Sequence, residues 1–170
     1  VLAAGTAGVV AVHSLSKRSN LAGARAGFFA GDPELVGYLL EVRRHAGLMV
    51  PGPVQAGAAV AWGDDAHVLE QRRRYLGRLT YVREFLDAIG LPAPMPGGGF
   101  YLWVPVPATM GGGGWELTEH LAVAAGMLVS PGDLYGPDGA GFVRIAVVQP
   151  MERLAVVAAR LSGRVSIVTR

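Results

Sequence analysis

The residues best suited to chemistry lie close together near the start of the chain. Ser14, Ser16 and Lys17 stand within four positions, and Arg25 follows eight positions after the lysine. Lys17 is the only lysine in a chain with 15 basic residues. A primary amine can form a Schiff base with an aldehyde. Hydroxyl groups and a planar guanidinium can bind a phosphate. The segment therefore predicts a site for a compound that carries both an aldehyde and a phosphate.

Pyridoxal 5′-phosphate (PLP) carries both groups, and it is the cofactor that this combination of side chains indicates. The apolar run from Gly8 to Val12 predicts a buried strand, so the lysine would stand in a loop at a strand end. The simpler alternative is a surface lysine that follows a strand. In that case the neighbouring serines and Asn20 would be ordinary turn residues.

The whole segment resembles a known one. Ser14 to Lys17, followed by Gly-Ala-Arg-Ala-Gly-Phe at residues 23–28, resembles the PLP-lysine segment of class I/II (fold type I) aminotransferases. The resemblance extends over nearly all of the 170 residues. It implies that Lys17 holds PLP and that Ser14 and Arg25 contact the phosphate, with Ser16 as a weaker candidate. Residues 13–23 are most similar to the actinobacterial succinyldiaminopimelate aminotransferases of that family.

A second candidate for chemistry lies near the end of the chain. Arg144 stands between Val143 and Ile145 in a predicted strand, so its side chain should face away from theirs. Such an arginine can reach solvent or pair with a structural carboxylate. Phe142 to Ala146 also resembles the family's small-domain strand, whose arginine binds the substrate α-carboxylate, and a bidentate guanidinium suits that role. Tyr101 and Tyr135 are predicted either to pack in the interior or to touch substrate.

The elements that must position these residues alternate between strand and helix. Asp32 and Pro33 mark a helix start, because aspartate caps helices and proline suits the first helical position. The helix that follows has one apolar face. Interleaved strands and helices indicate an α/β fold. The predicted strands are 9–13, 26–30, 100–104, 127–130 and 142–147, and the predicted helices are 33–45, 54–62, 65–89, 115–125 and 151–161.

The resemblance also implies a domain organisation. Residues 1–64 would be the end of the PLP-binding large domain, 65–90 a connecting helix, and 91–170 the small C-terminal domain. A segment rich in proline and glycine, residues 90–99, supports a linker there. Family members carry further PLP contacts upstream of the lysine, including an aspartate on the pyridine nitrogen. Because 16 residues precede Lys17, we expect the chain to be the C-terminal portion of a fold type I transferase.

Composition excludes several classes of function. Half of the residues are hydrophobic (51%), with a mean hydropathy of +0.37, which is typical of a globular protein. The net charge is +2, and the one basic triplet, Arg72 to Arg74, is predicted to be a solvated helix face, so no nucleic-acid partner is expected. The four histidines lack metal-ligand spacing, so no metal is predicted. The absence of cysteine is compatible with a cytoplasmic protein, and the apolar runs are too short for a membrane span.

The function that the resemblance implies is transfer of an amino group between an amino acid and a 2-oxo acid, by a PLP-dependent homodimer. The expected pair is N-succinyl-LL-2,6-diaminopimelate with 2-oxoglutarate, a reaction of lysine biosynthesis. Aspartate and aromatic amino acids are alternative substrates. A different class of function is also open: a non-catalytic truncated fragment or an aminotransferase-like regulatory binding domain.

Overall fold

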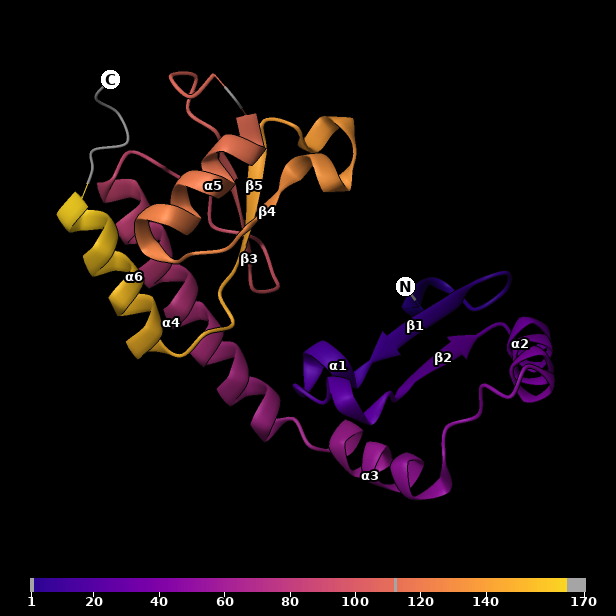
Figure 1. Ribbon diagram of the computed structural model, residues 1–170. Coiled ribbons are helices and arrows are strands. Elements are labelled where there is room, and N and C mark those ends of the chain that lie inside the picture. Colours follow the sequence, from indigo (N-terminus) through magenta and orange to yellow (C-terminus); the bar gives the residue numbers. More distant parts are fainter. Residues whose placement is uncertain (1, 112, 165–170) are drawn as a thin grey trace. The chain divides into compact units, whose positions relative to one another are not determined.

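The structure is a computed structural model that describes residues 2–111 and 113–164 (Figure 1). Contacts within the chain divide it into two compact units, residues 1–71 (unit 1) and residues 72–170 (unit 2). The division falls inside the helix α4 (Ala66–Ala88). The predicted domain limits at residues 64 and 90 stay a prediction.

Unit 1 contains a two-stranded antiparallel sheet. Strand β1 (Val10–Ser14) pairs with β2 (Gly27–Gly31), so that Ser14 lies opposite Gly27. Both ends of β2 are glycine because the strands approach closely there. A Cβ at Gly27 would lie 2.5 Å from the carbonyl oxygen of His13, and one at Gly31 would overlap the carbonyl oxygen of Val9. The two predicted strands are therefore present, each one residue later than expected.

The helices of unit 1 follow from clear local signals. Asp32 caps α2 (Pro33–His45) by accepting hydrogen bonds from the backbone N–H groups of Glu34 and Leu35, as predicted. Its other oxygen accepts from the N–H of Gly8 at 2.7 Å. The remaining helices are α1 (Leu15–Arg18), α3 (Gly52–Gly63) and the short 3-10 turns η1 (Leu2–Ala4) and η2 (Ala22–Ala24).

The predicted burial of unit 1 is wrong. The strand expected to be buried leaves Val12 74% exposed, and Leu35, Leu40 and Val42 on the apolar face of α2 are exposed as well. Within unit 1, the described residues form a sheet of two strands, and Leu15 and Ala26 are the only buried hydrophobic residues among them. Apolar periodicity identifies a face that is able to pack, but burial also requires a partner layer.

Unit 2 has a three-stranded antiparallel sheet in the order β3-β5-β4, formed by β3 (Tyr101–Pro105), β5 (Phe142–Ala146) and β4 (Ser130–Pro131). The helices α4, α5 (Gly113–Ala125) and α6 (Met151–Arg164) accompany it, and Figure 1 shows them along the sheet. The core lies among these elements. Its largest fully buried side chains are Val82, Leu86, Leu91, Leu102, Val104, Leu117, Leu121, Val143 and Val147.

The strand predicted over residues 127–130 is mostly absent. Gly126 ends α5 with a positive φ of 69°, and the N–H of Met127 returns to the carbonyl of Leu121. This turn carries the chain past the sheet, so Leu128 is 84% exposed and pairing begins only at Ser130. A helix C-cap therefore replaces the first three residues of the expected strand.

The described part of the chain contains no helix long and apolar enough to cross a membrane. It also contains no group of three or more His, Asp or Glu side chains that is arranged to hold a metal ion.

Candidate functional site

The lysine segment folds into one helical turn directly after β1. Ser14 is the N-cap of α1, and its Oγ accepts a hydrogen bond from the N–H of Ser16 at 3.1 Å. The Ser14 hydroxyl in turn donates to Ser16 Oγ at 3.0 Å. Lys17 follows in the same turn and is exposed. The local sequence thus places two hydroxyls and the amine within four positions, at the cap and in the first turn of one short helix.

Arg25 lies at the end of the lysine loop, just before β2. It stands between η2 and β2 in the left-handed conformation, with a φ of 51°, and its guanidinium donates to the carbonyl of Ala22 at 3.2 Å. The carbonyl of the next residue, Ala26, accepts a hydrogen bond from the N–H of Leu15 at 3.1 Å. The loop from β1 to β2 therefore closes on itself and brings its two ends together.

Ser14, Ser16 and Arg25 line one cavity of about 620 Å³ in unit 1. This volume is within the usual range for small-molecule sites. Arg43 is a further lining residue, and among the described residues no Asp or Glu lines the cavity. The cavity is consequently suited to an anion. Lys17 is not a lining residue, although Ser16, its neighbour in the same turn, is.

Aromatic side chains form one wall of the same cavity. The ring of His13 stacks on Phe28, with centroids 5.5 Å apart and planes at 22°. Trp62 of α3 meets Phe28 edge-on at 4.7 Å. All three residues line the cavity. The wall therefore joins the β1-β2 sheet to the end of α3 beside the serine hydroxyls.

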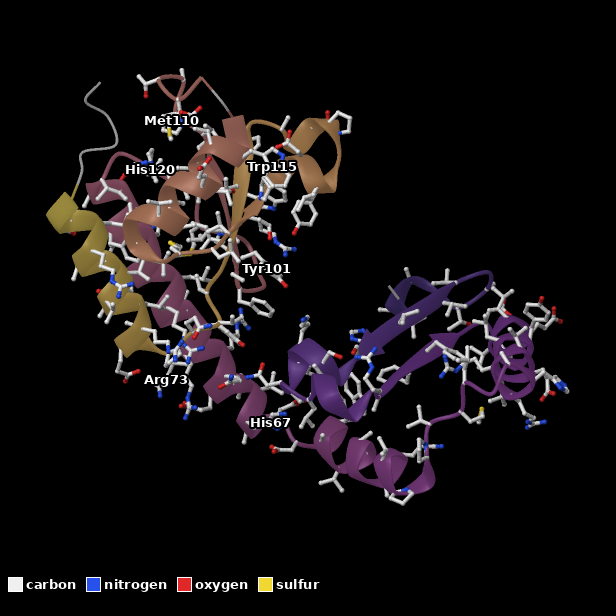
Figure 2. All side chains as sticks on the ribbon, viewed as in Figure 1. His67, Arg73, Tyr101, Met110, Trp115 and His120 are labelled. Carbon is white, nitrogen blue, oxygen red and sulfur yellow. The ribbon has the colours of Figure 1, made fainter. Side chains whose placement is uncertain are left out.

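Arg144 lies in unit 2, on β5, where it pairs in register with Trp103. Its neighbours Val143 and Ile145 are buried, so the strand directs Arg144 to the opposite face, as predicted. The guanidinium carbon lies 4.3 Å from the ring centroid of Tyr101 and 4.5 Å from that of Tyr135. Tyr101 stands on β3 (Figure 2).

The surroundings of Arg144 are aromatic rather than acidic among the described residues. Among the described residues no carboxylate pairs with Arg144, and its Nε is buried without a hydrogen-bond partner. A structural carboxylate is therefore not the reason for its position. Two tyrosine rings hold the guanidinium by cation–π contacts, each worth roughly 0.5–2 kcal/mol. Tyr135 is 46% exposed and so does not pack in the interior, and a contact of either tyrosine with substrate stays a prediction.

Comparison with known proteins gives matches over most of the chain. The family model for aminotransferase class I and II matches residues 1–161. The chain belongs to this family. The 4-dedimethylamino-4-oxo-anhydrotetracycline transaminase OxyQ of Streptomyces rimosus is 50% identical over 155 residues, which are 91% of this chain and 42% of that protein. An LL-diaminopimelate aminotransferase of Syntrophobacter fumaroxidans is 34% identical over 146 residues, 85% of this chain and 37% of that protein.

Solved aminotransferase structures have the same fold. The substrate-bound structure of BacF from Bacillus subtilis superposes with a TM-score of 0.83 at 27% identity, and it covers 95% of this chain and 42% of BacF. The fold is thus that of a fold type I transferase, as predicted. The chain spans less than half of the length of the relatives that it matches.

Class I and II aminotransferases depend on PLP, and the residues of unit 1 fit that cofactor. Two hydroxyls and the Arg25 guanidinium face one cavity, which supplies neutral and charged donors for a phosphate. The Lys17 amine, which can react with the aldehyde of PLP, is in the same helical turn as these hydroxyls. The aromatic wall offers flat apolar surface for a ring. The roles of Ser14, Ser16, Lys17, Arg25 and Arg144 stay predictions.

The sequence analysis missed two residues that contact the lysine turn. The Arg18 side chain lies against the end of α3, and His67, labelled in Figure 2 at the start of α4, contacts Ser19. The position of Arg18 directly after Lys17 is the one feature of the sequence that could have identified it. Its partner Asp65 lies 47 residues away in the sequence. Asp64 caps α4 by accepting from the N–H of Ala66 at 2.8 Å.

Proposed function

We propose that the protein carrying this chain is a PLP-dependent aminotransferase. The observation that carries the proposal is the shared cavity of Ser14, Ser16 and Arg25, beside the chain's one lysine, in a member of the class I and II family. When bound, PLP supplies an aldehyde that receives the amino group and a ring that withdraws electrons from the substrate Cα.

The residues of unit 1 would then bind the cofactor and move a proton. The hydroxyls of Ser14 and Ser16 donate hydrogen bonds to the phosphate, and Arg25 adds a charged donor that fixes its orientation. Lys17 holds the cofactor through its Nζ. Once free, the same Nζ would serve as the base that accepts the proton from the substrate Cα.

Arg144 would bind the substrate carboxylate. A guanidinium forms two parallel hydrogen bonds with a carboxylate, which fix the orientation of the amino acid as well as its charge. The contacts with the Tyr101 and Tyr135 rings already restrict the motion of the guanidinium. Little side-chain freedom is therefore lost when substrate binds. The buried Nε without a partner supports a ligand as the missing partner of this side chain.

For the substrate we propose N-succinyl-LL-2,6-diaminopimelate, with 2-oxoglutarate as the amino acceptor. The support is the resemblance of residues 13–23 to that subfamily, together with the diaminopimelate aminotransferases among the relatives. Aspartate and aromatic amino acids stay the alternatives. We also propose that the protein acts as a homodimer, the usual state of the family. A cytoplasmic location stays a prediction from the cysteine-free composition.

The test is a donor panel with the intact protein, PLP and 2-oxoglutarate, in which glutamate formation is measured for each amino acid. We expect the highest kcat/KM with N-succinyl-LL-2,6-diaminopimelate and no glutamate with Lys17→Ala. A higher kcat/KM with aspartate or an aromatic amino acid would change the substrate. If no donor gave glutamate, the non-catalytic alternative would replace the proposed function.

A further inference from the structure

The residues that follow Lys17 are held by a second set of contacts, separate from those of Ser14 and Ser16. These contacts join the lysine turn to the α3–α4 junction, which we define as residues 61–67. All of the residues concerned belong to unit 1. The helix α1 itself is only four residues long, too short to be stable without support.

Arg18 makes most of these contacts. Its guanidinium donates to the carbonyls of Ala61 at 2.7 Å and Trp62 at 3.4 Å, and it forms an ion pair with Asp65 at 2.5 Å. The guanidinium carbon also lies 5.0 Å from the centre of the Trp62 ring. The Arg18 side chain is 19% exposed. A cation placed on the last carbonyls of a helix is stabilised by those groups and by the helix dipole.

His67 completes the junction. Its Nδ1 lies 2.8 Å from Asp64 Oδ2, and its Nε2 lies 2.9 Å from Ser19 Oγ. A carboxylate only accepts hydrogen bonds, so Asp64 accepts one from the Nδ1–H of His67, and the Nε2 of that tautomer can accept one from the Ser19 hydroxyl. The hydrogen bond from His67, followed by that from the Ala66 N–H, holds the pKa of Asp64 below its ordinary value. Asp64 thus stays charged and keeps this tautomer.

Apolar packing alone does not fix the lysine turn. Leu15 and Ala26 are the only buried hydrophobic residues of unit 1 among those that the structure describes. The carbonyl of Leu15 accepts hydrogen bonds from the N–H groups of Ser19 at 3.0 Å and Leu21 at 3.3 Å. These bonds stabilise the turn internally. The polar contacts of the residues after Lys17 therefore stabilise the turn in addition to the packing of Leu15.

Helix geometry links these contacts to Lys17. Successive residues of a helix point about 100° apart, so Ser16, Lys17 and Arg18 point in three set directions. Ser16 faces the cavity and Arg18 faces the α3–α4 junction. When both of these directions are fixed, the direction of the lysine between them is fixed as well.

We propose that Arg18 and His67 form a clamp that positions Lys17. They are positioning residues: Arg18 fixes the rotation of the lysine turn, and His67 holds its end through Ser19. The catalytic consequence rests on the proposed function, whereas the clamp itself is a property of the fold. Arg18 makes the larger contribution, because it combines three hydrogen-bonded partners with an aromatic contact.

The test is amide hydrogen exchange of residues 15–21 in the intact protein, measured by mass spectrometry for Arg18→Ala and His67→Ala. The reporting amides are those of Ser19 and Leu21, which bond to Leu15. We expect exchange about tenfold faster for Arg18→Ala, because a charged and partly buried hydrogen-bond network is lost, and a smaller increase for His67→Ala. Arg44→Ala is the matched control, since Arg44 pairs with Glu41 inside α2, and it should leave these amides unchanged.

Two further variants keep the test decisive if Arg18→Ala does not fold. Arg18→Lys keeps the charge but not the forked geometry, so we expect partial protection. Asp65→Asn weakens the clamp from the far side, and it should speed exchange less than Arg18→Ala does. Exchange equal to that of Arg44→Ala in all of these variants would overturn the clamp.

A second readout separates the clamp from the proposed function. PLP is added to each variant, borohydride is applied after set times, and the rate of adduct formation at Lys17 is measured. We expect an at least fivefold slower rate for Arg18→Ala with Arg18→Lys between it and the wild type. Faster exchange with an unchanged trapping rate would overturn the positioning role. If the wild type formed no adduct, the proposed function would fail, and the exchange data would still decide the clamp.

Discussion

Arg144 in unit 2 and Lys17 in unit 1 are held by different means. Arg144 stands on a strand whose adjacent side chains, Val143 and Ile145, are buried in a continuous core. Lys17 stands on a four-residue helix in a unit with two buried hydrophobic residues among those described, and hydrogen bonds and one ion pair fix that helix. A packed strand therefore positions Arg144, whereas a polar network positions Lys17.

The largest stability effect should come from the core of unit 2. Leu86 of α4 is fully buried, whereas Leu76 of the same helix is 56% exposed. We expect Leu86→Ala to lower the free energy of unfolding by about 2–5 kcal/mol and Leu76→Ala by less than about 1 kcal/mol. Urea unfolding of the intact protein measures both. Equal losses for the two variants would show that burial in the core of unit 2 does not set the stability of this unit.

The next effect concerns the support of Arg144. Removal of its guanidinium should raise the KM for the amino acid about a hundredfold in Arg144→Ala, because a charged bidentate contact is lost. Tyr101→Phe keeps the ring under the guanidinium and should stay within about twofold of wild type, whereas Tyr101→Leu should raise KM several-fold. Steady-state kinetics test this order. An effect of Tyr101→Phe as large as that of Tyr101→Leu would mean that the hydroxyl, and not the ring, is the important group.

Arg25 offers a smaller and more specific effect in unit 1. Arg25→Ala should weaken PLP binding about tenfold to a hundredfold, because one charged hydrogen-bond donor to the phosphate is lost. Arg43→Ala is the control, since Arg43 lines the same cavity but donates to the carbonyl of Leu48. Equilibrium titration with PLP gives the dissociation constants. Equal weakening in both variants would indicate a general effect of positive charge rather than a phosphate contact by Arg25.

The smallest effect is the pH dependence of the α2 cap. The N–H of Gly8, followed by that of Leu35, holds the pKa of Asp32 below its ordinary value. The unfolded chain therefore binds a proton at a higher pH than the folded chain. The cap's stabilisation is present above a pH of about 4 and is lost as the pH falls through the lower pKa of the folded state.

Asp32→Asn tests this prediction, because the amide keeps an oxygen acceptor but does not titrate. We expect the difference in unfolding free energy between wild type and Asp32→Asn to shrink as the pH falls below about 4. Denaturant unfolding at a series of pH values measures it. A difference that does not change with pH would show that the carboxylate charge contributes nothing to the cap.

Local features of the fold were predictable from the sequence. The bounds of α2 and its Asp32 cap follow from side-chain chemistry within a few residues, and both agree with the structure. Ser14, Ser16 and Arg25 were predicted from a short segment, and they do line one cavity. Such features depend on nearby residues, which is why sequence patterns indicate them.

Features that depend on distant contacts were not predictable. The 74% exposure of Val12 depends on which distant residues pack against its strand, which periodicity does not reveal. The contact of Arg18 with Asp65 joins residues 47 positions apart. The first residues expected in β4 were lost to the turn at Gly126, where a local cap outweighed a short apolar run.

The central claim is that Lys17 is the residue that holds PLP, and one measurement tests it most directly. The intact protein is incubated with PLP, reduced with borohydride, digested and analysed by mass spectrometry. Lys17 is the only lysine of this chain, so its peptide is unambiguous. We predict a phosphopyridoxyl adduct on Lys17 at about one per chain, and its strong reduction in Arg25→Ala at limiting PLP. An intact protein whose Lys17 peptide stays unmodified would contradict the claim.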